Sequence, residues 1–273
     1  MRGLFSALFL VSSLAGGTAM AQPYQPNEAG VTMGHWHLNS RDPVANKKIF
    51  VGMGGVDTSN DRFQAVTFPG VLINLNLGGG GPPSTGGSVG SVVNHVGFIV
   101  KNVPESVAKW KANGVTVLPG NNGRTDQAYV ETPDGLRIEI LENKDQKEPI
   151  RHEHVHFFVP QDQIPAMQAW YAKIFGAKAS TTRTNAPVDD VPGAQLRFNK
   201  ADAAQAPTKG RVLDHIGFDV VDLQAFVKKL EAEGIKLDRP YSKAPNGVGL
   251  AFITDPWGTY IEINERPKAV YLP

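Results

Sequence analysis

The sequence predicts an α+β fold in which one unit, a strand followed by a helix and about three further strands, is repeated four times. The main observation is an opening pattern that recurs: a histidine, then apolar residues at the second, fourth and mostly sixth positions. This alternation is typical of a strand with one face on a core, so the histidine lies on the opposite face. The four openings span residues 35–40, 95–100, 154–159 and 215–220.

A helical pattern follows three of these openings. Amphipathic segments occur at residues 104–113, 163–175 and 223–233, and a glycine ends each one. In unit one the corresponding residues 42–50 are shorter and less typical of a helix. Short apolar runs separated by turn residues complete the units and predict strands. Such runs occur at residues 71–77, 194–199, 250–253 and 260–264.

Units two and four close with similar strands that each contain a glutamate. Glu139 follows Gly135 by four residues, and Glu262 follows Gly258 by the same distance. Isoleucines flank both glutamates, and strand alternation places them on the core face. The two glutamates therefore point to the same side as the histidines.

The composition of the linkers predicts how the units pair. A Gly- and Pro-rich segment at residues 78–87 joins units one and two, residues 201–210 join units three and four, and the charged residues 142–151 form a linker between these pairs. We therefore expect two domains, at residues 33–143 and 151–267, with a linker at residues 144–150.

Residues 1–21 have the features of a secretory signal peptide: Arg2, an apolar run, and Ala19-Met20-Ala21 as a cleavage site. We expect a mature chain from Gln22 and a secreted or periplasmic location, a retained membrane anchor being the alternative. The chain has no cysteine, which excludes disulfides, thiolate metal sites and cysteine nucleophiles. With 27 basic and 26 acidic residues, nothing in the charge favours nucleic acid or an anionic membrane.

These patterns together resemble the vicinal oxygen chelate superfamily, which includes glyoxalases, bleomycin resistance proteins and extradiol dioxygenases. The resemblance rests on the His-x-Gly-Phe openings at residues 95–98 and 215–218, the helix end at 170–176 and the two Gly-x-x-x-Glu strands. It implies that paired units curl into a cup around a divalent metal, such as Fe(II), Mn(II), Zn(II) or Ni(II). Its metal ligands would be His35, His95 and Glu139 in the first domain, and His154, His215 and Glu262 in the second.

Two departures bear on the reaction that the resemblance implies. Glyoxalases use a fourth ligand, typically a glutamate at the end of the first unit, but residues 72–76 and 195–199 contain no carboxylate. Tyr129 lies ten residues before Glu139, as does a tyrosine that contacts substrate in extradiol dioxygenases, whereas Phe252 has this offset from Glu262. We therefore expect an extradiol-like enzyme with Tyr129 as a catalytic residue. A tyrosine that only packs at the sheet edge is the alternative.

Other interpretations remain open from the sequence. His37 and His156 share a strand face with His35 and His154, so either member of each His-x-His pair fits the ligand position. Such pairs are also typical of cupin barrels, but the helices disfavour an all-β barrel. A glyoxalase-like isomerase or lyase and a metal-free binding protein are the alternative functions. We expect a small-molecule substrate, a monomer or homodimer, and a surface position for His152.

Overall fold

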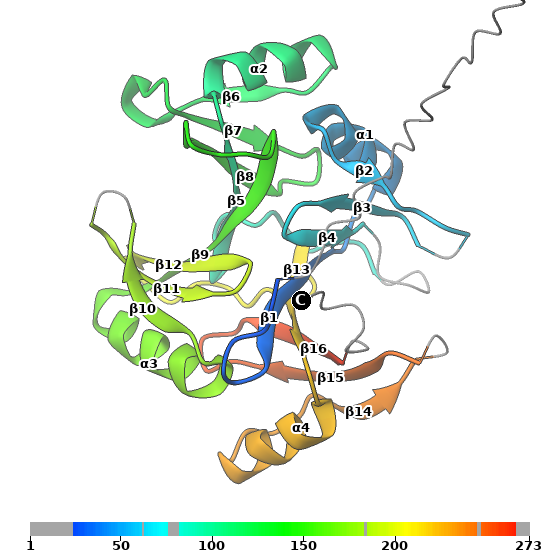
Figure 1. The fold of residues 1–273 in the computed structure, drawn as a ribbon, viewed down its shortest axis with the longest axis vertical. Coiled ribbons are helices and arrows are strands. Elements are labelled where there is room, and N and C mark those ends of the chain that lie inside the picture. The colour runs from blue at the N-terminus through cyan, green and yellow to red at the C-terminus, as the bar shows by residue number, and fades with distance from the viewer. Residues whose placement is uncertain (1–23, 62, 76–81, 183–184, 245–246, 266–273) are drawn as a thin grey trace, which may run out of the picture.

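The computed structural model describes residues 24–61, 63–75, 82–182, 185–244 and 247–265. Two mixed sheets of eight strands each form its framework (Figure 1). Within the described residues every unit contributes four strands and one α-helix, which confirms the predicted α+β fold of four repeated units. The predicted signal peptide lies outside the described residues.

The four units have the same order of elements. Unit one consists of β1 (Val31–Leu38), α1 (Pro43–Met53), β2 (Val56–Asp57), β3 (Ala65–Phe68) and β4 (Val71–Asn74). Unit two consists of β5 (Val93–Val100), α2 (Val103–Ala112), β6 (Val117–Pro119), β7 (Gln127–Glu131) and β8 (Arg137–Glu142). Unit three consists of β9 (Ile150–Pro160), α3 (Ile164–Phe175), β10 (Lys178–Thr181), β11 (Pro187–Val191) and β12 (Ala194–Ala201). Unit four consists of β13 (Leu213–Val220), α4 (Leu223–Ala232), β14 (Arg239–Lys243), β15 (Gly249–Thr254) and β16 (Tyr260–Glu265).

Helix α1 is longer than the sequence pattern of unit one suggested. The Asp42 side chain accepts a hydrogen bond from the Ala45 N–H at its start, which satisfies a backbone donor without a partner in the helix. Pro43 occupies the first turn, where its missing N–H costs nothing. Gly54 ends the helix in the left-handed conformation, with a φ of 109°. These local signals compensate for weak amphipathicity.

The pairing of units differs from the prediction. One sheet, which we call the terminal sheet, joins units one and four in the order β14-β15-β16-β13-β1-β4-β3-β2. The other, the central sheet, joins units two and three in the order β10-β11-β12-β9-β5-β8-β7-β6. In each sheet the two opening strands pair antiparallel, β1 with β13 and β5 with β9. Units one and two, and units three and four, therefore lie in different sheets, and the predicted pairing of these units around a common site is wrong.

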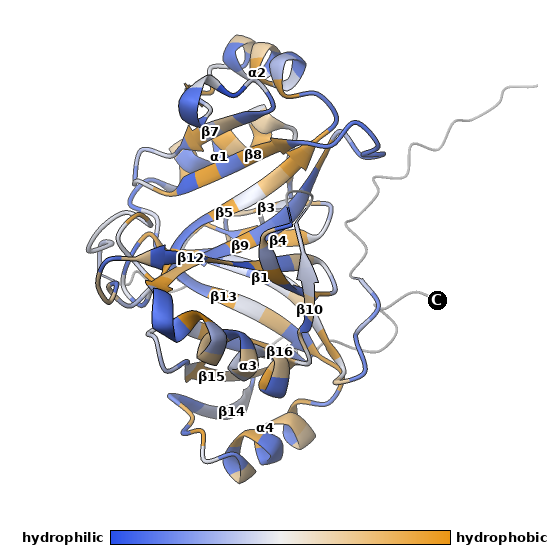
Figure 2. Ribbon diagram, turned by 90° about the vertical axis from the view of Figure 1, so that its left-hand side faces the viewer, coloured by the Kyte–Doolittle hydropathy of each residue, from blue (hydrophilic) through white to orange (hydrophobic). Residues whose placement is uncertain are grey.

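Consecutive units contact each other through their apolar faces instead. Trp36 of β1 packs against Phe98 of β5, with ring centroids 5.3 Å apart. Phe175 at the end of α3 stacks on Phe218 of β13 at 4.4 Å. Helices α1 and α2 accordingly lie together at one end of the molecule, and α3 and α4 at the other (Figure 1). Helices α2 and α4 carry both hydrophobic and hydrophilic residues along their length, as Figure 2 shows.

His152 belongs to this core, so its predicted surface position is wrong. The side chain is 1% exposed, and its ring lies 4.9 Å from the Trp36 ring. Its Nδ1 hydrogen-bonds the carbonyl oxygen of Gly193. Strand β9 begins at Ile150, the last residue of the predicted linker at residues 144–150. Among the described residues, no helix is long and apolar enough to cross a membrane.

Candidate metal centres

Each sheet brings histidines and a glutamate together on the face opposite the apolar core. His95, Glu139, His154 and His156 gather in the central sheet, and we call this cluster the central site. His35, His37, His215 and Glu262 gather in the terminal sheet as the terminal site. In each cluster the ligand atoms lie within 4.8 Å of one another. Strand alternation thus turns all the predicted ligands to the expected face.

The grouping of the predicted ligands changes with the pairing of units. His95 and Glu139 meet His154, not His35, and His215 and Glu262 meet His35, not His154. Both predicted triads are therefore wrong as sets, although every one of the six residues lies in a cluster. His37 and His156 belong to the clusters together with His35 and His154 rather than replacing them.

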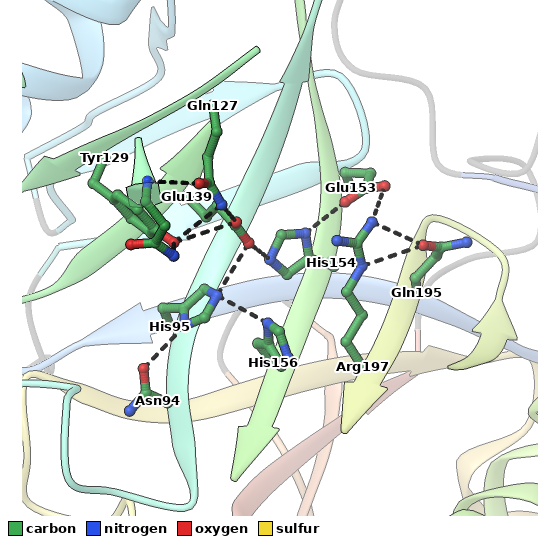
Figure 3. A network of polar contacts seen from close by, with 11 residues as sticks. Asn94, His95, Gln127, Tyr129, Glu139, Glu153, His154, His156, Gln195 and Arg197 are labelled. Carbon is green, nitrogen blue, oxygen red and sulfur yellow. Dashed lines mark hydrogen bonds and ion pairs between the residues drawn. The ribbon is translucent and has the colours of Figure 1, made fainter. Parts of the chain in front are cut away.

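The central site is arranged around one carboxylate oxygen (Figure 3). His95 Nε2 and His154 Nε2 each lie 3.2 Å from Glu139 Oε2. The first contact is a hydrogen bond, whereas His154 Nε2 has no hydrogen-bond partner among the described residues despite complete burial. His156 Nδ1 lies 2.9 Å from His95 Nε2. Three imidazoles and a carboxylate therefore converge on one point.

Two glycines make room for imidazoles from the neighbouring strand. A Cβ at Gly97 would lie 1.9 Å from His154 Cε1, and a Cβ at Gly217 would lie 2.0 Å from His35 Cε1. Any side chain at these positions would occupy the space of the ring. The glycine of each His-x-Gly-Phe opening is thus explained by the close approach of the antiparallel partner strand.

Residues that precede the histidines orient the rings. His154 Nδ1 donates to Glu153 Oε2 at 2.5 Å, and His215 Nδ1 donates to Asp214 Oδ1 at 2.6 Å. His95 Nδ1 lies 2.9 Å from Asn94 Oδ1. A carboxylate only accepts hydrogen bonds, so it fixes the proton on Nδ1 and leaves Nε2 as the metal-binding atom. A hydrogen-bond acceptor directly before the histidine recurs in three of the four units, at Asn94, Glu153 and Asp214, and is the sequence signal for these orienting residues.

Burial and neighbouring charges set the protonation of the central site. Burial lowers the pKa of His95 and, more strongly, that of His156. Burial also disfavours charge on His154, but the contacts of its two nitrogens with Glu139 and Glu153 outweigh it and raise the pKa. Although burial opposes ionisation of Glu139, its contacts with His154 and His95 hold the pKa of that carboxyl far below its ordinary value. The site therefore presents an ionised carboxylate to nitrogen atoms.

Tyr129 lies beside this carboxylate. Its hydroxyl donates to Glu139 Oε1 at 3.4 Å and accepts hydrogen bonds from Asn121 Nδ2 at 2.8 Å and Gln127 Nε2 at 3.1 Å (Figure 3). Gln127 Nε2 also donates to Glu139 Oε1. Partial burial, then the negative charge of Glu139, raises the pKa of Tyr129 to about 12. The hydroxyl therefore keeps its proton at neutral pH.

The terminal site repeats this arrangement with one difference. Glu262 Oε2 lies 2.8 Å from His215 Nε2 and 3.4 Å from His35 Nε2, which has no hydrogen-bond partner among the described residues. Asn264 Nδ2 donates to Glu262 Oε1 at 2.7 Å. Phe252 pairs with Glu262 in register, as Tyr129 does with Glu139. The terminal site therefore has no hydroxyl at the position of Tyr129.

Strand register identifies the residues that stand where a second glutamate ligand would be expected from the resemblance to glyoxalases. In units two and four, Gly97 pairs with Glu139 and Gly217 with Glu262. At the same register, His37 of unit one pairs with Asn74, and His156 of unit three pairs with Arg197. Arg197 forms an ion pair with Glu153 and does not extend the set of metal-binding groups. Asn74 and Arg197 thus stand at the positions where the sequence lacked a second glutamate.

Comparison with known proteins supports the assignment of the fold. A family model described as Glyoxalase/Bleomycin resistance protein/Dioxygenase superfamily matches residues 153–263. A probable chloroplastic lactoylglutathione lyase of Arabidopsis thaliana is 25% identical over 173 residues, which cover 58% of this chain and 48% of that protein. Lactoylglutathione lyase of Escherichia coli O157:H7 is 38% identical over 61 residues, or 21% of this chain and 45% of that protein. The chain thus spans about half the length of the curated relatives it matches.

Solved structures align with most of the chain. Glyoxalase I from Zea mays has a TM-score of 0.62 at 16% identity and aligns with 86% of this chain and 92% of its own. A putative dioxygenase from Bacillus subtilis subsp. subtilis str. 168 has a TM-score of 0.62 at 14% identity, with 86% and 85% covered. At these identities the likeness establishes the fold alone. Residues 153–263 thus match the glyoxalase, bleomycin resistance protein and dioxygenase superfamily, and the fold of the chain is similar to that of glyoxalase I.

Proposed function

We propose that the chain is a metal-dependent enzyme that acts on a small organic substrate with two neighbouring oxygens, and that its central site is catalytic. The observation that carries this proposal is the contact between His154 Nε2 and Glu139 Oε2. Glu153 accepts a hydrogen bond from Nδ1, so Nε2 is the ring atom that faces the carboxylate oxygen 3.2 Å away, and a metal that binds there takes the place of the Nε2 proton. Two electron-rich atoms in this position are stabilised by a cation between them.

The donor set fits a divalent metal. Imidazole nitrogens and a carboxylate oxygen suit Fe(II), Mn(II), Zn(II) and Ni(II). Two donors bound to one ion at about 2.1 Å lie roughly 3.0 to 3.4 Å apart, close to the 3.2 Å separations from Glu139 Oε2 to the two Nε2 atoms. His95, His154 and Glu139 would hold the ion. A bound divalent metal would supply positive charge that orients the substrate oxygens and stabilises their negative charge.

Ring-opening oxygenation of a catechol-like compound is the reaction that the residues favour. Tyr129 keeps its hydroxyl proton and borders the carboxylate of the site, so it can donate a hydrogen bond or a proton to a substrate oxygen. Asn121 and Gln127 hold the phenol oxygen in place. Because Phe252 replaces this tyrosine in the terminal site, we assign the reaction to the central one.

Isomerisation of a lactoylglutathione-type substrate is the second candidate, because the relatives found by sequence comparison are lactoylglutathione lyases. Asn74 and Arg197 disfavour this isomerisation. They take the register position of the second carboxylate, and neither amide nor guanidinium can serve as a base near neutral pH.

Metal analysis and two activity assays test these functions. Protein stripped of metal and reloaded with each candidate ion should consume oxygen with a catechol, and His154→Ala should abolish both uptake of metal by the central site and turnover. A matched variant, His215→Ala in the terminal site, should retain turnover. Formation of thioester from a glutathione hemithioacetal without oxygen uptake would establish the isomerase instead. Tight retention of an organic ligand with no metal and no turnover would establish a binding protein.

We also propose that the chain is exported. Arg2, the apolar run and Ala19-Met20-Ala21 support this proposal. Expression of the full chain in a Gram-negative host should yield periplasmic protein beginning at Gln22, as measured by fractionation and N-terminal sequencing. Cytoplasmic protein that retains Met1 would contradict export.

A further inference from the structure

We propose that each site holds its metal ion with three imidazoles and one carboxylate, the third imidazole being His156 in the central site and His37 in the terminal site. This inference rests on the metal binding proposed above and extends its ligand set. His156 and His37 thereby take the place of a second carboxylate ligand.

The position of the His156 ring carries the inference. Its Nδ1 lies 2.9 Å from His95 Nε2, about the separation of two atoms bound to one ion. His156 as a residue is 9% exposed, and the other nitrogen of its ring, Nε2, has no hydrogen-bond partner among the described residues. Figure 3 shows the rings of His95, His154 and His156 on neighbouring strands, around the Glu139 carboxylate. The Nδ1 atom of His156, which hydrogen-bonds His95 Nε2 in this structure, therefore lies where both nitrogens could bind one ion in place of that hydrogen bond.

Strand register explains why the third ligand is a histidine. In units two and four, glycine stands opposite glutamate, so the donor comes from the closing strand. In units one and three, the closing strand offers Asn74 or Arg197, and the opening strand supplies His37 or His156 at the position of the glycine. The donor of units one and three therefore stands on the opening strand, one strand spacing of about 4.8 Å from the closing strand that carries the glutamate in units two and four.

The arrangement occurs twice in the chain. The rings of His156 and His95 have centroids 4.4 Å apart at an angle of 58°, and those of His37 and His215 have centroids 4.6 Å apart at 53°. The two pairs lie in different sheets and share no residue. Repetition of the same geometry argues that the third imidazole is part of the site.

The ligand set has a consequence for the substrate. Three neutral imidazoles and one carboxylate leave a divalent ion with a net charge of +1, whereas two carboxylates would neutralise it. The net positive charge favours an anionic pair of oxygens, such as a deprotonated diol, enediol or 2-oxo acid. A six-coordinate ion would keep two positions for these oxygens.

X-ray absorption spectroscopy on the metal-loaded wild-type protein tests the ligand set without a mutation. The expected result is three imidazoles per ion, averaged over both sites. Two imidazoles per ion would overturn the inference and leave the proposed function standing. Failure of the wild-type protein to bind any of the candidate metals would overturn both.

A variant isolates the central site. In a His215→Ala background, which disables the terminal site, His156→Ala should raise the dissociation constant for Co(II) by at least about 100-fold, since even loss of an outer partner costs 10- to 100-fold. The visible Co(II) spectrum should change, and free imidazole should restore it by filling the vacated position. Phe158→Ala is the matched control, because it removes a ring beside His156 that offers no donor atom. An unchanged dissociation constant and spectrum in a folded His156→Ala variant would overturn the inference.

Discussion

Gly97→Ala is expected to empty the central site of metal through a contact that can be measured in the structure. The added Cβ would lie 1.9 Å from His154 Cε1, whereas an ordinary contact begins at 3.4 Å. The ring would have to move by about 1.5 Å, and metal bonds tolerate deviations of only about 0.2 Å. The backbone itself accepts alanine, because Gly97 is not among the glycines with positive φ. The displaced imidazole is therefore the direct cause of the effect.

Elemental analysis after dialysis measures the outcome. Gly97→Ala should retain metal in the terminal site alone, and Gly217→Ala, whose Cβ would lie 2.0 Å from His35 Cε1, should retain it in the central site alone. Overpacking should also lower the free energy of unfolding of the apoprotein by about 1 to 3 kcal/mol. Both effects have the same origin, so they should appear together.

Two further variants separate the clash from a general loss of structure. Gly249→Ala is the control, since its Cβ would meet no atom closer than 3.2 Å, and it should keep both sites loaded. Gly97→Ala combined with His154→Ala removes the clashing ring, so it should recover stability without recovering metal. Binding of metal by the central site of Gly97→Ala with wild-type affinity would refute a displacement of the His154 ring.

Three other substitutions have defined outcomes. Tyr129→Phe should lower kcat by about 10²- to 10⁴-fold with unchanged metal content, and equal kcat would show that the hydroxyl only packs. Glu153→Gln should weaken metal binding in the central site by about 10- to 100-fold, because the ring proton of His154 is then less firmly held on Nδ1; unchanged affinity in a titration would contradict this. Burial raises the pKa of Asp255, so the wild type loses stability as the pH rises from about 4 through that pKa. Asp255→Asn keeps the two turn hydrogen bonds to Oδ1 and can donate to the Tyr171 hydroxyl. Denaturant unfolding should therefore show a higher free energy of unfolding than the wild type at pH 7, and this difference should fade near pH 4. A difference that does not depend on pH would refute the linkage.

Much of the fold follows from local patterns in the sequence. Alternation around His95 and His215 predicted the opening strands, and glycines 114, 176 and 234 marked where helices end. Helix α1 was less clear because its apolar face is weak, and the cap at Asp42 adds the missing signal. These features depend on neighbours within a few residues of sequence, which is why one chain suffices to predict them.

The ligands could be predicted one by one but not as sets. Each site combines a His-x-His opening, as at His154, with a His-x-Gly opening, as at Gly97, whose glycine accommodates the partner ring. Pairing unit one with two, or three with four, would satisfy the same rule. Side-chain patterns on one strand do not specify which strand lies beside it, so the sequence was compatible with both groupings.

Linker length, rather than linker composition, distinguishes the two pairings. Residues 143–149 connect β8 to β9 across β5, a distance of two strand spacings or about 10 Å, which a short segment spans within one sheet. The longer linkers between units one and two and between units three and four pass from one sheet to the other. Where they meet, Val92 N donates to the Ala206 carbonyl and Val212 N donates to the Gly86 carbonyl. The Gly- and Pro-rich composition of the first linker suggested a joint within a domain, but both linkers cross between the sheets and hydrogen-bond each other. These crossings hold the apolar faces of consecutive units together.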